Sequence, residues 1–571
     1  MVMLCLSISA SAYDFEVDGI AYTITSLTDL TVSVDQLVNN DATKIVIPES
    51  VAYKNKTLNV TGIKANAFKG NTKISEISLP NTITSIGANA FMNDSSLVTI
   101  NTPHSLSSIG SYAFAGCSSL TAFFIPEGIE EINDGTFKEC KSLKNIELHS
   151  SINLIGESAF CGSGLQSIVI PSSVVSIGNR AFAGTKLVEI NLPAGIETIP
   201  EGCFSGCSEL QNITFSSNVI SSGAFQNCIA LQEITLPESL TTIGDKAFAG
   251  CKNLKEIAIP SSVSKIEPTI LWDCQNLETL KIGSGLRGFP VYAHNYSRGS
   301  YSYETLGGYY AYTPQQGIYG PWIADETYLQ SVKEFIIEDS DTEFSIKGFQ
   351  INNNTTTPPF TNTDLDYYYV GRPLVEIQRW SSDIGSTGFV VEIKQGTGRI
   401  SKLEIGGKCT SVPYFYQRVD TLKLGANITE FNLSNIYKEN LAKIECLSVT
   451  PPICCLGNFP TKVYTDAILC VPVGCKEAYA NAEIWKNFWN IFEVDNESGI
   501  TKIPNVKDDV LYHVYNIAGL LVGESYSLEE IKQLPNGIYI LVNKSKRYKI
   551  LVCIYNHRTT KTNQKYPSVN L

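Results

Sequence analysis

Residues 231–251 read LQEITLPESLTTIGDKAFAGC, and variants of this stretch recur along the first half of the chain. The position of Leu231 is apolar in every copy, and successive copies lie 21 to 23 residues apart: Ile74, Leu97, Leu120, Leu143, Leu165, Leu187, Leu210, Leu231, Leu254 and Leu277. This period is too short for helical pairs or propeller blades and favours a solenoid of short coils. One coil cannot enclose a core, so neighbouring coils must stack to bury their apolar residues.

Each copy has the same internal order. Its opening, Leu-x-x-Ile-x-Leu, alternates apolar and polar residues as a short strand with inward apolar side chains does. A proline usually follows and ends the strand because it has no N–H to donate: Pro80, Pro103, Pro126, Pro171, Pro193, Pro237 and Pro260. Ile-Gly then predicts a turn. A phenylalanine column next predicts rings packed between coils: Phe68, Phe91, Phe114, Phe137, Phe160, Phe182, Phe204, Phe225 and Phe248.

Cysteines also follow the repeat, three residues after the phenylalanine position: Cys117, Cys140, Cys207, Cys228, Cys251 and Cys274. Adjacent coils about 4.8 Å apart are close enough for disulfides. Other copies carry Ser163 or Thr185 near this place, so pairing is not enforced, and we favour a ladder of buried thiols. The cysteines of the second half, Cys454, Cys455, Cys470 and Cys475, lack zinc-knuckle spacing and leave one disulfide open.

Composition excludes several classes of partner. The 571 residues include 43 basic and 56 acidic side chains, a formal charge of −13, which disfavours nucleic acid and anionic membrane surfaces. No apolar run is long enough for a transmembrane helix. The histidines are far apart in sequence, and we expect neither a metal nor a cofactor: His104, His149, His294, His513 and His557.

The first twelve residues, MVMLCLSISASA, are apolar and end in Ala10-Ser11-Ala12. This pattern predicts a secretory signal peptide cleaved before Tyr13. The basic segment that usually precedes the apolar stretch is missing, which is consistent with a truncated leader. The alternative is a short buried strand.

The motif LxxIxLPxxLxxIGxxAFxxC, matched from Leu231 to Cys251, closely resembles the repeats of the BspA-like leucine-rich repeat family of surface proteins. The strand pair expected over 15–24 resembles the element that precedes those repeats, and Tyr369-Val370-Gly371-Arg372 resembles a strand-turn of its degenerate copies. The resemblance covers about residues 13–495. It implies a leucine-rich repeat solenoid of about 23-residue coils with a parallel β-sheet on one face, displayed at the cell surface. It also implies adhesion to host matrix or plasma proteins.

The regular spacing breaks after residue 288. Residues 289–330 are rich in tyrosine without periodicity, which predicts an insertion loop whose rings contact a partner: Tyr301, Tyr303, Tyr309, Tyr310 and Trp322 are the candidates. Alternatively, the rings plug one face of the solenoid. Strand-like segments then resume irregularly at 332–337, 368–371, 391–394, 403–405 and 422–424. Residues 467–489 resemble the closing cap of the family, a last strand followed by a helix with an aromatic face.

The C-terminal segment predicts a separate small domain. Strand patterns at 512–519, 534–542 and 546–552 predict a β-sandwich, and LPNGIYIL at 534–541 resembles the sorting domains of the type IX secretion route. The tail extends past the point where such domains normally stop. The predicted organisation is a leader (1–12), N-terminal strands (13–62), regular repeats (63–288), an insertion (289–330), degenerate repeats and cap (331–495), a linker (496–504), a sorting-like domain (505–553) and a tail (554–571).

No catalytic motif accompanies this organisation. Glu76, Glu189, Glu233 and Glu256 recur in phase with the repeat and predict a solvated face rather than an acid–base pair. The outward strand positions instead form a mostly small and polar set, here called the outward column: Ser78, Asn101, Phe124, Glu147, Val169, Asn191, Thr214, Thr235, Ala258 and Lys281. Such a surface suits a broad contact with an extracellular protein or glycan. The alternatives are a structural surface component without a dedicated ligand and, less favoured, a glycan-active enzyme. The sequence does not set the oligomeric state.

Overall fold

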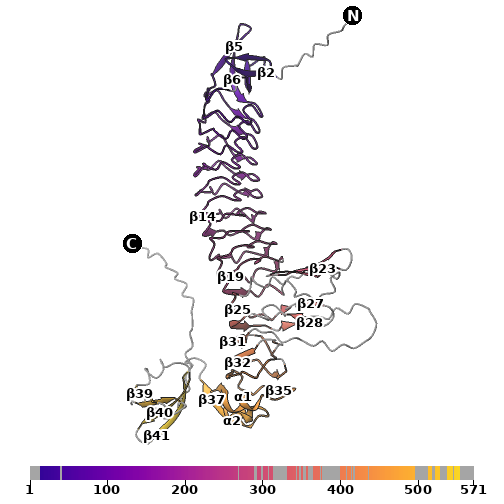
Figure 1. Cartoon of the computed structure of the whole chain (residues 1–571), viewed down its shortest axis with the longest axis vertical. Coiled ribbons are helices and arrows are strands. Elements are labelled where there is room, and N and C mark those ends of the chain that lie inside the picture. The colour runs from indigo at the N-terminus through magenta and orange to yellow at the C-terminus, as the bar shows by residue number, and fades with distance from the viewer. Residues whose placement is uncertain are drawn as a thin grey trace, which may run out of the picture. The chain divides into compact units, whose positions relative to one another are not determined.

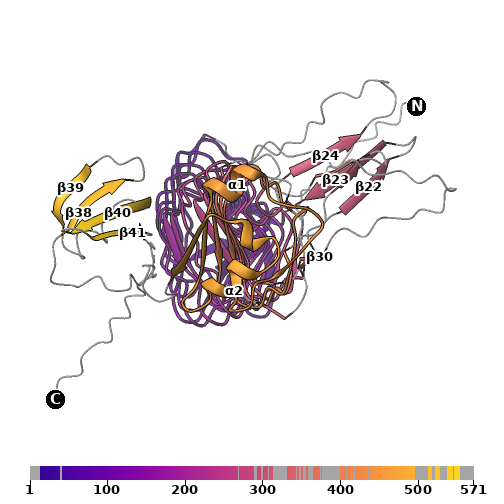
Figure 2. The ribbon, with the colours of Figure 1, turned by 90° about the horizontal axis from the view of Figure 1, so that it is seen from below.

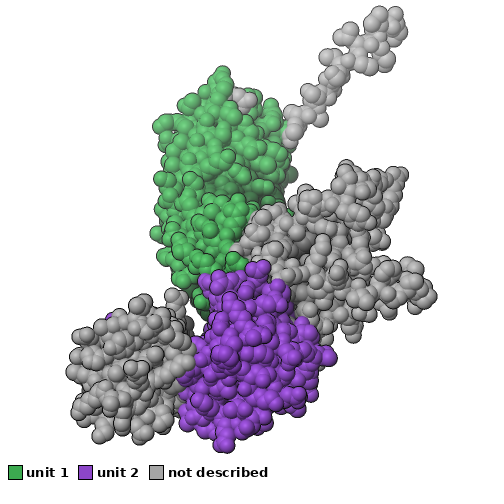
Figure 3. All heavy atoms as spheres, turned by 60° about the horizontal axis from the view of Figure 1, so that its bottom comes forward, with its two compact units in different colours: residues 1–338, 342–365, 374–393 green, residues 339–341, 366–373, 394–571 purple. Residues whose placement is uncertain are grey.

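The computed structural model describes residues 13–38, 41–267, 269–287, 331–341, 364–372, 399–406, 408–412, 415, 418–434 and 436–494, and the backbone of further strands named below. The predicted leader, Trp322, the strand at 391–394, the linker and the tail lie outside the described residues. Two compact units divide the chain (Figure 3): residues 1–338, 342–365 and 374–393 form the first, and residues 339–341, 366–373 and 394–571 form the second.

The first unit opens with a mixed sheet that covers its first coil. β1 (Phe15–Val17) and β2 (Ile20–Ser26) form the expected antiparallel pair. β3 (Thr31–Leu37) continues this meander, and β6 (Lys56–Ile63) pairs with β3 in parallel and with β5 (Ser50–Tyr53) antiparallel. β6 then pairs in parallel with β8 (Ser85–Ile86), which joins the N-terminal strands directly to the coils.

The coils that follow stack along one axis in the first unit (Figure 1). The Leu-x-x-Ile-x-Leu segments form a first strand row as predicted: β4 (Lys44–Val46), β7 (Glu76–Ser78), β9 (Thr99–Ile100), β14 (Glu189–Asn191), β16 (Asn212–Thr214), β19 (Glu256–Ile259), β21 (Thr279–Ile282) and β25 (Glu334–Ile337). Pairs within this row are parallel. The leucines that open the copies, Ile74 among them, are fully buried, so the predicted register is confirmed.

A second parallel row differs from the expectation of a sheet on one face only. It comprises β8, β10 (Ser108–Ile109), β11 (Glu131–Ile132), β12 (Leu154–Ile155), β13 (Ser176–Ile177), β15 (Thr198–Ile199), β17 (Val219–Ile220), β18 (Thr242–Ile243) and β20 (Lys265–Ile266). Each of these strands ends at an isoleucine, and in five of them, β8, β10, β12, β13 and β18, this is the isoleucine of Ile-Gly, where we predicted a turn. Two residues are too few to show an alternating pattern, so no periodicity in the sequence indicates these strands.

Where glycine follows a second-row strand, it serves close packing between coils rather than a turn. The Gly110 amide donates to Ile86 O at 2.8 Å, and a Cβ at Gly110 would lie 2.5 Å from the Ala88 amide nitrogen. Gly87, Gly156, Gly178 and Gly244 would meet backbone of the preceding coil in the same way. The missing side chain therefore lets neighbouring coils approach one another.

We expect Gly110→Ala to lower the free energy of unfolding by about 1–3 kcal/mol, because the added methyl group overpacks rigid backbone. Gly195→Ala is the matched control, since its added Cβ would meet nothing nearer than 3.6 Å. Chemical denaturation of both variants measures the difference. Equal stability of the two variants would contradict this role for the glycine column.

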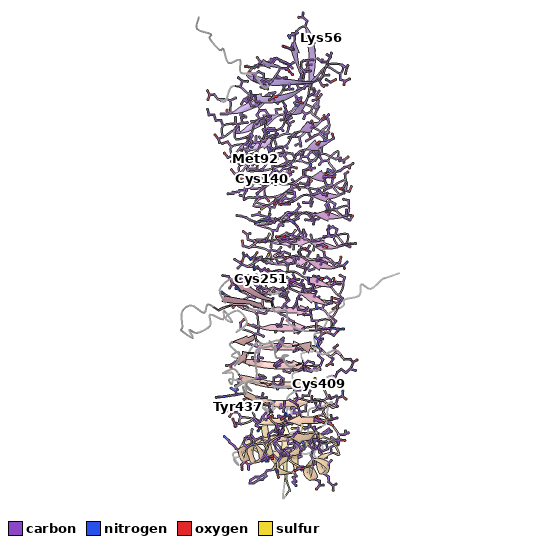
Figure 4. The ribbon with its side chains drawn as sticks, turned by 90° about the vertical axis from the view of Figure 1, so that its right-hand side faces the viewer. Lys56, Met92, Cys140, Cys251, Cys409 and Tyr437 are labelled. Atoms are coloured by element: carbon purple, nitrogen blue, oxygen red, sulfur yellow. The ribbon has the colours of Figure 1, made fainter. Side chains whose placement is uncertain are left out.

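The phenylalanine column is a continuous stack inside the first unit. Adjacent rings from Phe68 to Phe248 have centroids 5.1 to 5.8 Å apart and planes within 10° of parallel. The six predicted ladder cysteines are free and buried beside it. Figure 4 marks two of them, Cys140 and Cys251, at their levels in the stack. Both predictions are confirmed.

Parallel strands also build the second unit. β29 (Leu365–Val370), β31 (Arg399–Ile405), β32 (Arg418–Leu424), β34 (Lys443–Cys446), β36 (Ile468–Pro472) and β37 (Asn490–Val494) follow one another, with parallel pairs from β31 to β37. A two-stranded sheet of β33 (Glu430–Asn432) and β35 (Ile453–Cys455) accompanies it. The irregular strand-like segments that fall on described residues are therefore strands.

An aromatic cap lies at the end of the second unit, among α1 (Thr461–Asp466), α2 (Lys476–Asn481) and η3 (Trp485–Asn487). Trp485 is fully buried, and its Nε1 donates to Pro452 O at 2.8 Å. Tyr479 is also buried and donates to Ser448 O at 2.8 Å. The predicted aromatic cap is present, although Trp489 is exposed and one more strand, β37, follows the helices.

Smaller sheets are described by their backbone alone. β22 (Tyr292–Tyr296), β23 (Ser300–Thr305) and β24 (Gly308–Tyr312) form an antiparallel meander (Figure 2). β26 (Phe344–Ser345) pairs with β30 (Leu374–Val375), and β27 (Phe349–Ile351) pairs with β28 (Thr355–Thr357).

Near the C-terminus, β38 (Tyr512–Asn516), β39 (Leu521–Tyr526), β40 (Gly537–Asn543) and β41 (Lys546–Val552) form one antiparallel sheet in the order β39-β38-β40-β41. Three of these strands match the sequence prediction, and β39 was missed. A sandwich needs a second sheet, which the described part of this segment does not contain, so the sandwich is not confirmed.

Candidate binding surface

The first strand row carries two outward positions in each coil. In β7, for example, Glu76 and Ser78 are exposed on either side of the buried Ile77. Nine of the ten residues of the outward column are exposed, and Lys281 is half-buried. The structure therefore brings the predicted outward column together on one face of the first unit.

Many polar side chains on this face form hydrogen bonds or ion pairs with the neighbouring coil. Asn101 Oδ1 accepts from the Leu79 amide at 2.6 Å, while its Nδ2 donates to Leu79 O at 2.8 Å. Thr214 Oγ1 donates to Asn191 Oδ1 at 2.5 Å. Lys281 Nζ lies 2.5 Å from Glu256 Oε1. These side chains join coils to one another, a role that sequence spacing alone did not reveal.

The ladder of the first strand row is interrupted after β9, and Asn145, Ser167 and Glu233 form only isolated bridges in their coils. Phe123 stands inward where neighbouring coils carry Ile100 and Ile146, and its ring lies 4.8 Å from Phe114 and 4.9 Å from Phe137. Residues 122–124 form no strand, and the next strand of this row is β14. The outward residue of this coil, Phe124, is 52% exposed.

The acidic residues that recur in phase with the repeat lie at the surface of this face. Glu76, Glu189, Glu233 and Glu256 are exposed, as predicted for a solvated face. Among the described residues, no group of three or more His, Cys, Asp or Glu side chains is placed to hold a metal ion. The described helices include none that is both long and apolar enough to cross a membrane.

The outward side of the second unit's sheet is lined by ion pairs. Lys423 Nζ lies 2.7 Å from Glu404 Oε1, and Tyr367 Oη donates to Glu404 Oε2 at 3.0 Å. Burial alone would raise the pKa of Glu404, but the hydrogen bond and charge of Lys423 hold that pKa below its ordinary value. Glu404 is therefore a stably ionised partner in a surface network rather than a proton donor.

The buried thiols of the cysteine ladder are hydrogen-bonded and protonated. The Sγ–H groups of Cys207 and Cys251 donate to the phenylalanine carbonyls of the preceding coil, Phe182 O at 3.1 Å and Phe225 O at 3.2 Å. Burial raises the pKa of Cys251 to about 12, so its reactive thiolate form is suppressed. The cysteines of the second unit, Cys454, Cys455, Cys470 and Cys475, are free as well, so the disulfide left open among them is not formed.

One titratable group in this ladder escaped the sequence analysis. Asp94 follows Phe91 by three residues and so occupies the cysteine position of its coil. It is fully buried, its Oδ1 accepts from the Asn71 amide at 2.9 Å, and its Oδ2 has no hydrogen-bond partner. Burial raises the pKa of Asp94 to about 8, although the Asn71 hydrogen bond opposes the shift. Alignment to the phenylalanine column would have identified this residue.

The tyrosine candidates belong to strands instead of the aperiodic loop that we predicted for them. Tyr301 pairs with Tyr312 and Tyr303 with Tyr310 across β23 and β24. Tyr309 faces Glu304 in the same ladder. The alternation in Ser300-Tyr301-Ser302-Tyr303, with tyrosine's preference for strands, was the signal that sequence analysis missed.

Comparison with known proteins agrees with the repeat fold. The family described as BspA type leucine rich repeat region matches in six copies, over residues 61–188, 130–228 and 175–300. A leucine-rich repeat protein from Bacteroides ovatus ATCC 8483 is 24% identical over 76% of this chain and 94% of its own, with a TM-score of 0.45.

Two further solved structures are similar to parts of this chain. A leucine rich cell surface protein from Faecalibacterium prausnitzii A2-165 is 27% identical over 49% of this chain and 92% of its own, with a TM-score of 0.35. The pneumococcal vaccine antigen PcpA is 18% identical over 64% of this chain and 98% of its own, with a TM-score of 0.38. No curated protein matches the chain significantly.

Proposed function

From the BspA type leucine-rich repeats over residues 61–300, we propose that this chain is a secreted, cell-surface protein that binds an extracellular protein or glycan without catalysis. The observation that carries the proposal is the outward column, a row of exposed and mostly small side chains repeated from coil to coil. Stacked parallel strands offer an extended surface rather than a pocket, which suits a large partner.

The competing role is a structural surface component without a dedicated ligand. Binding of the purified mature chain to arrays of extracellular-matrix proteins and of glycans separates the two. Saturable binding to one class of array spot supports the adhesin-like role, and its absence from both arrays supports the structural role. Turnover of an arrayed glycan would instead favour the enzyme alternative.

Export and surface display form part of the proposal, because the chain combines the apolar leader pattern with LPNGIYIL near its C-terminus. We expect a truncation ending at Val494, the last residue of β37, to be exported but no longer held at the surface. Fractionation of cells that carry the full chain or the truncation measures this. Unchanged surface retention of the truncated chain would remove the addressing role from residues 505–553.

The tyrosine-rich strands are a second proposed contact region. We expect the double change Tyr301→Ser and Tyr303→Ser to weaken partner binding without lowering the melting temperature, since aromatic side chains often dominate binding energy. The double change Tyr309→Ser and Tyr310→Ser extends the test to β24. Intact binding with a lower melting temperature would show that these rings plug the solenoid instead.

A further inference from the structure

Phe124 differs from the rest of the outward column. Its neighbours in the column on the adjacent coils are the polar Asn101 and Glu147, and the second outward position of its own coil holds the small Ala122. The other strongly exposed apolar residue of the column, Val169, lies two coils away and has no ring. Within the outward column, Phe124 is thus the one aromatic platform, and the column residues of the two adjacent coils are polar.

Two interactions fix the backbone that carries the Phe124 ring: the packing of Phe123 in the core and a hydrogen bond from Thr102. Phe123, the neighbour of Phe124 in sequence, is anchored in the core between Phe114 and Phe137. Thr102 Oγ1 donates to Phe124 O at 2.8 Å and fixes the backbone where the strand ladder is interrupted. A ring on a fixed backbone loses little freedom when it binds a ligand, which favours affinity.

A second ring adjoins it. The His104 imidazole lies 5.9 Å from the Phe124 ring, centroid to centroid, with the two planes at 76°. His104 is exposed, and its ring nitrogens can donate or accept hydrogen bonds. The exposed Glu147 carboxylate on the next coil adds acceptors. Asn101 contributes less, because both ends of its amide bond to Leu79.

The size of this platform and the polar groups around it favour a carbohydrate ligand over a protein ligand. A protein hot spot usually joins several aromatic or arginine anchors in a desolvated cluster. A pyranose ring instead presents one apolar C–H face about as wide as a phenyl ring, surrounded by hydroxyl groups. A lone exposed ring with donors and acceptors beside it matches that pattern of apolar and polar surface.

We propose that Phe124 is the stacking platform for a pyranose residue of a glycan, with His104 and Glu147 as hydrogen-bonding neighbours. This inference rests on the proposed function and narrows its ligand to a carbohydrate at one coil of the first unit.

The test uses the full mature chain on an array of immobilised oligosaccharides, followed by titration with the soluble form of the tightest-binding oligosaccharide. We expect Phe124→Ser to weaken binding at least tenfold and Phe124→Trp to restore it, with unchanged melting temperatures. Val175→Ser is the control, because Val175 is exposed but lies outside the outward column.

Each outcome of the test is decisive for this inference. Glycan binding that survives in Phe124→Ser overturns the Phe124 site but leaves the adhesin-like role standing. Saturable binding to matrix proteins without any glycan binding overturns the carbohydrate ligand and again leaves the adhesin-like role. Absence of binding to both arrays overturns the inference together with the proposed function.

Discussion

Phe182→Ala is expected to lower the free energy of unfolding by about 3–5 kcal/mol, the usual loss when a buried phenylalanine is truncated. Phe182 is fully buried, and its ring stacks 5.6 Å from those of Phe160 and Phe204, centroid to centroid. Coils on both sides are pinned by backbone hydrogen bonds, such as Phe182 N to Cys203 O at 3.0 Å, so the cavity cannot collapse freely.

Denaturant melts of the purified chain measure this loss. Val175→Ala is the matched control, because Val175 is 63% exposed in the same coil and its truncation should change stability by less than about 0.5 kcal/mol. In a stacked array each coil is stabilised by its neighbours, so the melt should also broaden if the array separates at the cavity. A loss below about 1 kcal/mol for Phe182→Ala would mean that the ring column is not the core.

The second large effect concerns pH. Asp94 has a folded-state pKa of about 8, against an ordinary value of 3.8, so between these limits the folded chain holds a proton that the unfolded chain releases. The stability contributed by that proton is complete below about pH 4 and is lost as the pH rises toward 8. From pH 4 to pH 7 the loss is on the order of 4 kcal/mol.

Asp94→Asn isolates this contribution, because the amide does not titrate and its Oδ1 can still accept from the Asn71 amide. The other carboxylates are common to both chains, so their titration cancels in the difference between the two unfolding free energies. We expect that difference to move in favour of the variant as the pH rises from 5 to 8.

Asp94→Cys introduces the cysteine that six other coils carry at this position. We expect its unfolding free energy relative to wild type to change with pH as it does for Asp94→Asn. Cys117, the titratable neighbour on the next coil, stays a neutral thiol throughout this range because burial raises its pKa. A difference between wild type and both variants that does not change with pH would show that Asp94 is ionised in the folded chain.

The parts of the fold that the sequence predicted are those with a repeated side-chain signature. Leu231 and its equivalents, the phenylalanine column and the ladder cysteines each recur at one phase because each coil must present the same apolar group to its neighbour. Repetition also allowed the outward positions to be located, since side chains alternate along a strand.

The parts that were missed depend on contacts between coils rather than on local pattern. The second strand row consists of two-residue strands, and the role of Gly110 follows from its distance to Ala88 in another coil. Similarly, Asn101 is a polar surface residue in sequence, and only its bonds to Leu79 reveal a structural role. For the same reason the sequence located the outward column but could not rank Phe124 above its neighbours.

The most direct test of the account is a binding comparison between two faces of the first unit. One double variant, Phe124→Lys and Val169→Lys, changes the outward column at and near the proposed platform, and its control, Val175→Lys and Thr198→Lys, changes exposed residues on or beside the second strand row. We predict that the first weakens binding to the array ligand at least tenfold while the control binds as wild type, with similar melting temperatures. Equal binding by both double variants would contradict a binding role for the outward column.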